Sequence, residues 1–271
     1  VVVNADFYKA DIENVNFDGV DFENANFFGT NILEKYPSID SSEIIFTSKG
    51  DPINYSHYGF NDFIICCGYK GYMIKEFFNN YFLHISDVNI DIEKNNIQIL
   101  HKQDVKWKIT LVDTGEYTQT GGRLARVKDY VKGDFFMTYG DGLSNINIQT
   151  LLSFHQAHKK LATVSAVKPP GRFGALNIDI NNQVKKFNEK PSGDGGYING
   201  GFFVLDKKVL DYISGDSVPW ESTPMQKLTK ENQLVAFTHD DFWNPMDTLR
   251  DKQYLEDLWA KNQAPWRVWN E

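Results

Sequence analysis

Residues 135–142 read FFMTYGDG, an apolar run that ends in one carboxylate between two glycines. A short apolar run bounded by turn residues predicts a buried strand, here at residues 135–138. Glycine lets the backbone approach a bulky ligand, and open α/β sheets bind ligands outside the carboxyl ends of their strands. Asp141 is therefore a candidate for a carboxylate that faces a crevice, although an Asp–Gly pair most often marks an ordinary turn.

The sequence on both sides of this run alternates strand and helix patterns. Helical spacing of apolar residues predicts helices, and short apolar runs predict strands. Strands are expected at residues 63–67, 107–112, 162–167 and 183–187, a two-stranded hairpin at 88–92 and 97–101, and helices at 72–82, 123–131, 148–158 and 249–259. This rhythm predicts an α/β fold with a mostly parallel, Rossmann-like sheet covered by helices on both faces.

Asp247 is a second candidate carboxylate, in the sequence FWNPMDTLRD of residues 242–251. Mg²⁺ requires oxygen ligands and usually takes one or two carboxylates, while phosphate oxygens and water complete its shell. Asp141 and Asp247 would supply such a pair if the fold brought them together. The alternative is that Asp247 caps the helix predicted to follow it.

Two further regions carry groups suited to anions and sugars. Residues 118–123 read TQTGGR before a predicted helix, so free backbone N–H groups and Arg123 could face an anion; the alternative is a loop with a solvent-facing arginine. Glu189, Lys190 and Asn199 offer an acid, an amine and an amide, which together suit the hydroxyls and phosphate of a sugar phosphate. By themselves they equally fit a surface ion pair and a turn.

The N-terminal residues follow a different pattern. Residues 5–34 repeat every five residues as a small residue, Asp or Asn, and a large apolar residue. Neither a helix nor a plain strand has this period. The segment resembles the pentapeptide-repeat family, a right-handed square β-helix, in which six blocks would make about one and a half coils. The alternative is an irregular, phenylalanine-rich arm. We divide the chain into this repeat segment (1–34), a connector (35–51) and a main domain (52–271).

The composition limits the classes of function. Hydrophobic residues make up 41% of the chain, enough for a large core, and the formal net charge is −8. This charge argues against sequence-independent binding of nucleic acid and against an anionic membrane surface. No apolar run approaches the roughly 18 residues of a membrane span, and the first residues lack a signal-peptide pattern. A cytoplasmic protein is expected, with Cys66 and Cys67 as small core residues.

Taken in order, these segments resemble the sugar nucleotidyltransferase family, and they are most similar to its cytidylyltransferase branch. The similarity extends over residues 52–271, so the fold of that family is expected there. The segments that carry it are residues 58–72, 110–115, 120–126, 138–142, 169–176, 187–191, 198–204, 242–252 and 264–267.

The resemblance implies a role for each candidate residue. Asp141 and Asp247 would hold Mg²⁺ and take part in catalysis together with Lys190. The nucleotide contacts implied are Thr118, Arg123 and Gly140, and the contacts to glucose 1-phosphate are Gly174, Glu189, Lys190 and Asn199. The implied partners are CTP, glucose 1-phosphate and the product CDP-glucose, and a homo-oligomer is expected because family members form oligomers.

One departure from the family pattern affects the expected activity. Family members begin with a strand that runs into a loop of the type Gly-Gly-x-Gly-Thr-Arg, followed by Pro-Lys-Pro, which cradles the triphosphate. Residues 1–51 contain neither motif. The resemblance therefore implies an enzyme whose activity is impaired by this loss. The alternatives are a non-catalytic nucleotide-sugar-binding protein and a protein that binds a partner through its repeats.

Overall fold

The computed structural model describes residues 2–3, 22–23, 55–100, 105–170, 175–178, 183–188 and 196–269. The chain forms two compact units, Val1–Glu43 and Ile44–Glu271. In the first unit, β1 (Val2–Val3) pairs in parallel with β2 (Phe22–Glu23), with Val2 opposite Phe22. These partners are 20 residues apart, which equals four blocks of five and is the spacing expected of one square coil. Most of the repeat segment and the whole connector lie outside the described residues.

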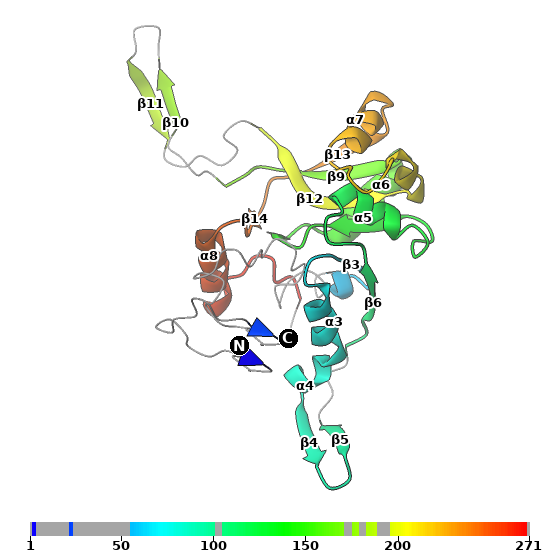
Figure 1. Ribbon diagram of the computed structural model, residues 1–271. Coiled ribbons are helices and arrows are strands. Elements are labelled where there is room, and N and C mark those ends of the chain that lie inside the picture. The colour runs from blue at the N-terminus through cyan, green and yellow to red at the C-terminus, as the bar shows by residue number, and fades with distance from the viewer. Residues whose placement is uncertain are drawn as a thin grey trace. The chain divides into compact units, whose positions relative to one another are not determined.

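The second unit contains a four-stranded sheet with the order β13-β9-β12-β7. Its strands are β7 (Phe135–Thr138), β9 (Ala162–Val167), β12 (Ile198–Leu205) and β13 (Leu234–His239). β13 is parallel to β9, whereas β12 runs antiparallel to both β9 and β7 (Figure 1). The sheet is thus mixed, with three strands in one direction. The antiparallel direction of β12 agrees with the segment that precedes it. Two parallel strands need a crossover between them, usually a helix. The described residues between β9 and β12 instead form the hairpin of β10 (Ala175–Ile178) and β11 (Val184–Asn188).

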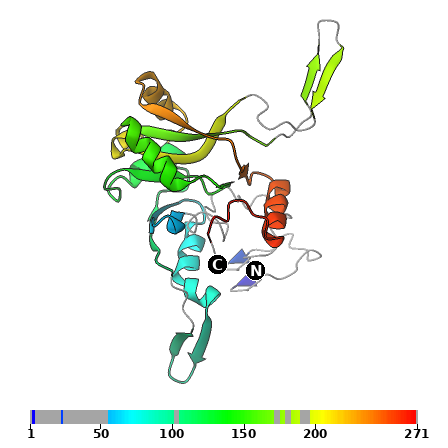
Figure 2. The ribbon, with the colours of Figure 1, turned by 180° about the vertical axis from the view of Figure 1, so that it is seen from behind.

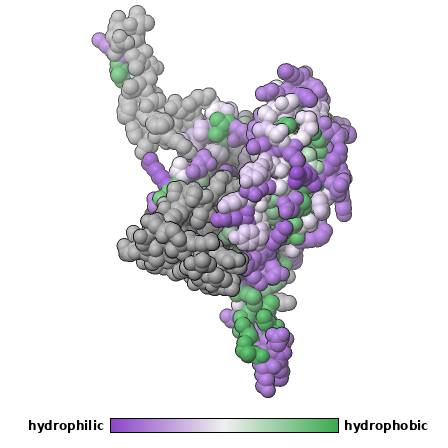
Figure 3. Space-filling view, in the orientation of Figure 1, coloured by the Kyte–Doolittle hydropathy of each residue, from purple (hydrophilic) through white to green (hydrophobic). Residues whose placement is uncertain are grey.

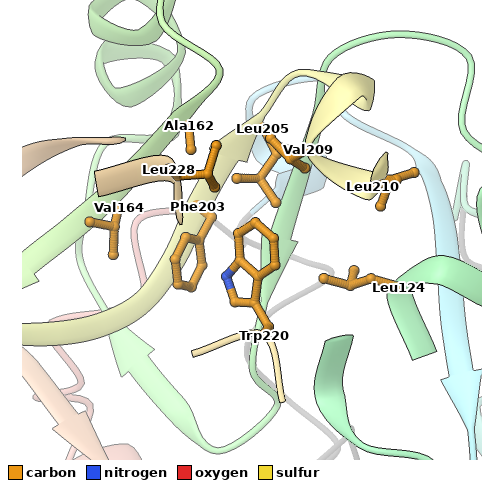
Figure 4. Close-up of a cluster of buried hydrophobic side chains, with 9 residues drawn as sticks. All are labelled: Leu124, Ala162, Val164, Phe203, Leu205, Val209, Leu210, Trp220 and Leu228. Atoms are coloured by element: carbon orange, nitrogen blue, oxygen red, sulfur yellow. The ribbon is translucent and has the colours of Figure 1, made fainter. Parts of the chain in front are cut away.

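One face of this sheet is covered by α5 (Thr120–Arg126), α7 (Thr223–Lys230) and the 3-10 helix η2 (Lys207–Tyr212). Phe203 and Leu205 of β12 point to this face, where they join a buried cluster that includes Trp220 (Figure 4). The other members of the cluster are Leu124, Ala162, Val164, Val209, Leu210 and Leu228.

The opposite face of the sheet is covered by α6 (Ile148–His158). Phe202 and Val204 point to this side, because successive side chains of a strand alternate between faces. They pack with Ile148 and Leu151 in a second buried cluster. The structure therefore confirms the predicted α/β fold with helices on both faces.

A second, two-stranded sheet consists of β3 (Asp62–Cys67) and β6 (Lys108–Asp113), which run parallel, with α3 (Gly71–Asn79) packed against β3 (Figure 2). The helix predicted at 72–82 is divided at Asn80, whose ψ of 11° lies outside the helical range, and α4 (Tyr81–Ile85) follows. Cys67 is buried beside Ile74, as expected of a small core residue.

The predicted hairpin is present as β4 (Asp87–Asp91) and β5 (Asn96–Leu100). Its register places Ile90 opposite Ile97, and each is 54% exposed, so hydrophobic side chains gather over this part of the surface (Figure 3). Among the helices that the structure describes, each is too short or too polar to cross a lipid bilayer.

Two histidines of α6 share one buried hydroxyl. His158 Nδ1 accepts a hydrogen bond from the Lys160 N–H at 2.9 Å, so its Nε2 carries the proton of the neutral ring. That Nε2 donates to Thr163 Oγ1 at 2.7 Å, and the Thr163 hydroxyl donates to His155 Nδ1 at 2.9 Å. Burial lowers the pKa of both histidines, and for His155 the nearby Asp134 and Asp206 oppose this shift.

We expect this pair to make the fold acid-sensitive. A histidine whose pKa is lower in the folded protein binds a proton less readily there than in the unfolded chain. Its contribution to stability is therefore complete above the unfolded pKa of about 6.5 and is lost as the pH falls below that value. Urea unfolding at a series of pH values should show the free energy of unfolding declining below about pH 6.5. The double variant His155→Asn, His158→Asn should decline less steeply there, and equal slopes would contradict the assignment.

Candidate active site

The two candidate aspartates lie at the same end of one short ladder. β8 (Gly142–Ser144) pairs antiparallel with β14 (Trp243–Pro245), with Gly142 opposite Pro245. Directly beyond this pair, the Met246 N–H donates to the Asp141 carbonyl oxygen at 2.7 Å. The ladder thereby brings together Asp141 and Asp247, which are far apart in the sequence.

The surroundings of Asp141 disfavour its charged form. Burial raises the pKa of Asp141, and the negative charge of Asp247 raises it further. Asp247 does not cap the following helix α8 (Leu249–Ala260), because Thr248 and Asp251 make that cap. The Asp251 N–H donates to Thr248 Oγ1 at 3.2 Å, and the Thr248 N–H donates to Asp251 Oδ2 at 3.1 Å. The capping alternative for Asp247 is therefore wrong.

This pair fits a hard divalent cation. Two carboxylates that repel one another are stabilised by a positive charge between them, and oxygen donors match the preference of Mg²⁺. Within the described ranges, no group of three or more His, Cys, Asp or Glu side chains could hold a metal ion by itself. At nucleotide sites Mg²⁺ is usually held by one or two carboxylates, with phosphate oxygens and water completing its shell, and Asp141 and Asp247 could supply such a pair.

Arg123 of α5 lies at the carboxyl ends of β3 and β6. Its Nη1 donates to Thr114 Oγ1 at 2.9 Å and its Nη2 donates to the Glu116 carbonyl oxygen at 3.3 Å. A Cβ atom at Gly68 would lie 2.3 Å from Arg123 Nη1, so only glycine leaves room for the guanidinium there. The sequence predicted a cation in this region, and the structure places it where α/β sheets bind ligands.

The backbone at the start of α5 differs from the expectation. The Gln119 N–H donates to the Asp216 carbonyl oxygen at 2.8 Å, and the Gly122 N–H donates to the Val218 carbonyl oxygen at 3.2 Å. The prediction that free N–H groups here face an anion is wrong for these two groups. A loop far away in sequence satisfies them, which no local pattern indicates. The nearby Thr118 is only 8% exposed.

The same loop makes Gly122 sensitive to substitution. A Cβ atom at Gly122 would lie 2.5 Å from the Asp216 carbonyl oxygen and 2.6 Å from its Cα, and backbone atoms cannot rotate away. We expect Gly122→Ala to lower the free energy of unfolding by about 1–3 kcal/mol. Gly133→Ala is the matched control, because nothing lies within 4 Å of a Cβ there. Equal stabilities of the two variants in urea unfolding would contradict the clash.

Asn199 lies next to the aspartate ladder. Its Oδ1 accepts a hydrogen bond from the Gly201 N–H at 2.9 Å, and Trp243 Nε1 of β14 donates to the Gly200 carbonyl oxygen at 2.8 Å. The start of β12 is thereby joined to the strand that leads to Asp247. Gly140 precedes Asp141 in the same turn and is half-buried. The other predicted sugar-phosphate residues, Gly174, Glu189 and Lys190, lie outside the described residues.

Comparison with known proteins gives the family. The sequence profile of the family described as "Nucleotidyl transferase" matches residues 71–255. The chain belongs to the nucleotidyl transferase family. A second profile, described as "Pentapeptide repeats (8 copies)", matches residues 4–34, which confirms the predicted repeat segment.

The relatives of this nucleotidyl transferase agree with that assignment. The chain is 55% identical over 217 residues to glucose-1-phosphate cytidylyltransferase of Salmonella typhi, covering 79% of this chain and 84% of the relative. It is 40% identical over the same length to the probable glucose-1-phosphate cytidylyltransferase of Bacillus subtilis, with the same coverage. The crystal structure of HddC from Yersinia pseudotuberculosis matches with a TM-score of 0.52 at 20% identity, covering 75% of this chain and 81% of that one. The last likeness supports the fold alone.

The structure of this nucleotidyl transferase adds Glu221 to the candidate site, a residue that the sequence did not indicate. The Tyr139 hydroxyl donates to Glu221 Oε1, and the Thr120 hydroxyl donates to Glu221 Oε2 at 2.8 Å. Tyr139 immediately precedes Gly140, and Thr120 begins α5. Glu221 is 82 residues from Tyr139, so no motif spacing could have found the contact.

Proposed function

We propose that this nucleotidyl transferase forms CDP-glucose and pyrophosphate from CTP and glucose 1-phosphate. The observation that carries the proposal is the meeting of Asp141 and Asp247 at one end of the β8–β14 ladder. The raised pKa of Asp141 supports it, because burial and, to a smaller extent, the negative charge of Asp247 raise that pKa. The choice of cytidine and glucose rests on the similarity to enzymes that carry the name glucose-1-phosphate cytidylyltransferase.

In the proposed reaction, a phosphate oxygen of glucose 1-phosphate attacks the α-phosphorus of CTP. The new bond joins that oxygen to the α-phosphorus, and the bond from the α-phosphorus to the bridging oxygen breaks, releasing pyrophosphate. The enzyme forms no covalent intermediate. Its contribution is to position two anions and to stabilise the charge at the reacting phosphorus.

The chain's own residues then have separate tasks. Asp141 and Asp247 would hold Mg²⁺, which neutralises phosphate charge when bound. Arg123 supplies a fixed cation on the nucleotide side, and the Asn199 amide hydrogen-bonds the sugar phosphate. The remaining proposed contacts are Thr118 and Gly140 for the nucleotide, and Gly174, Glu189 and Lys190 for the sugar phosphate, with Lys190 also stabilising charge during transfer.

The test is release of pyrophosphate by the purified chain with CTP, glucose 1-phosphate and Mg²⁺. Turnover above that of an Asp141→Ala variant is expected, together with a preference for CTP over the other nucleoside triphosphates. Turnover equal to that of the variant would overturn the proposal.

A second candidate function is that of a nucleotide-sugar-binding protein. Such a protein would use the same proposed contacts to sugar and base, and would bind CDP-glucose without making it. Calorimetry separates the two functions, since CDP-glucose binding without turnover supports a nucleotide-sugar-binding protein.

A further inference from the structure

Glu221 joins two parts of the proposed site through one carboxylate. It lies in the loop between η2 and α7, and each of its oxygens accepts one hydroxyl, from Tyr139 and from Thr120. Thr120 Oγ1 in turn accepts the Trp220 N–H at 2.8 Å, so the hydroxyl of Thr120 is held from both sides. An ionised carboxylate accepts two such bonds without donating any, which suits it to this position.

The backbone of Tyr139 extends the connection to Asn199. The Tyr139 N–H donates to the Gly201 carbonyl oxygen at 3.2 Å, and the Gly201 N–H donates to Asn199 Oδ1 at 2.9 Å. The carbonyl end of the Asn199 amide is therefore fixed by the residue that is hydrogen-bonded to Tyr139.

The ring of Tyr139 has little freedom to move. A Cβ atom at Gly201 would lie 2.9 Å from its Cδ2, and the Phe203 ring packs against it at a centroid distance of 5.9 Å. The loop that carries Glu221 is held equally firmly, because Gly121 and Gly122 of α5 lie against the backbone of residues 216–220. The hydrogen bonds thus run between two rigid elements.

We propose that Glu221 is a positioning residue: through Tyr139 it holds the Asn199 amide in place for the sugar phosphate, and through Thr120 it ties that contact to the helix that carries Arg123. The inference rests on the proposed function, because it takes glucose 1-phosphate as the ligand of Asn199. It predicts that loss of the Tyr139–Glu221 bond affects the sugar phosphate more than the nucleotide.

The experiment compares Tyr139→Phe and Glu221→Gln with a matched pair elsewhere in the chain. Tyr212 donates to Glu231 Oε2 at 2.5 Å, a bond of the same chemistry at the far end of α7, so Tyr212→Phe and Glu231→Gln are the controls. We expect each site variant to raise KM for glucose 1-phosphate roughly tenfold, the effect of one hydrogen bond to a charged group. KM for CTP should change less than twofold, and the melting temperature should shift no more than in the controls.

The double variant Tyr139→Phe, Glu221→Gln adds a second readout that a purely structural role would not move. Because the two residues act in series, its KM for glucose 1-phosphate should equal that of the single variants. The inference would be overturned by any of three results. The effects of the two single variants on KM could multiply in the double variant, KM for CTP could rise as much as KM for glucose 1-phosphate, or the site variants could have the same KM values as the controls.

The outcomes separate this inference from the proposed function. If the unmodified chain turns over and the site variants behave as the controls do, the positioning role alone fails. If the unmodified chain binds CDP-glucose without turnover, the same comparison is made with dissociation constants from calorimetry, and a tenfold weakening in the site variants alone supports the role. If the chain neither turns over nor binds CDP-glucose, the proposed function and this inference both fail.

Discussion

Replacing Asp141 with asparagine should lower turnover by about 10²–10³-fold and, in the absence of metal, stabilise the fold. Asparagine keeps the shape of the side chain but removes its charge. Burial and the charge of Asp247 raise the pKa of Asp141 above its unfolded value, so the ionised carboxylate costs folding free energy at every pH above that raised pKa. The expected rise in melting temperature without metal is about 2 °C.

Thermal unfolding in EDTA and in Mg²⁺ tests the metal site independently of turnover. Mg²⁺ should raise the melting temperature of the unmodified chain, because a ligand that binds only the folded state stabilises it, and should have a much smaller effect on Asp141→Asn. Asp129→Asn, at an exposed position of the surface, is the charge-matched control and should respond as the unmodified chain does. A response to Mg²⁺ that is the same in all three proteins would contradict the assigned ligands.

Replacing Phe203 with alanine should cause the largest loss of stability, about 3–5 kcal/mol. Phe203 is completely buried, and its ring packs edge-on against Tyr139 and against Trp220 at centroid distances of 5.9 and 6.2 Å. The truncation removes apolar contacts and leaves a cavity between rigid elements. Urea unfolding measures the loss, which corresponds to a fall in melting temperature of about 10 °C.

Two further variants control for the Phe203 result. Phe203→Leu fills most of the space and should lose less than half as much stability. Ile92→Ala should change stability by less than about 0.5 kcal/mol, because Ile92 is 84% exposed. If Phe203→Ala lowers the free energy of unfolding by less than about 1 kcal/mol, the buried cluster around Phe203 and Trp220 does not stabilise the sheet as described.

Local patterns in the sequence predicted most of the elements, for a physical reason. The strands at 135–138 and 162–167 and the helix at 148–158 have the predicted bounds, because short apolar runs and helical spacing act within one element. The helix predicted at 123–131 instead spans Thr120–Arg126. Glycine is a poor helix former, so local propensity does not predict that Gly121 and Gly122 are helical. Their place in the helix is explained by packing, because a Cβ atom at either position would collide with the backbone of residues 216–220.

The candidate site was predicted only in part. Asp141 and Arg123 follow from recognisable local patterns, and both lie at the carboxyl ends of strands. The direction of β12 and the contacts of Glu221 could not be predicted, because they depend on which strands pair and which loop reaches α5. The roles of all the site residues remain predictions: Thr118, Arg123, Gly140, Asp141, Gly174, Glu189, Lys190, Asn199 and Asp247.

Short consecutive motifs are enough to predict the family, the repeat segment and the residue types that could bind a metal and two phosphates. The meeting of Asp141 with Asp247, and the link that Glu221 makes between Tyr139 and Thr120, become visible only in the folded chain. Those contacts connect residues far apart in the chain, and they form only when β8 pairs with β14 and the loop before α7 packs on α5.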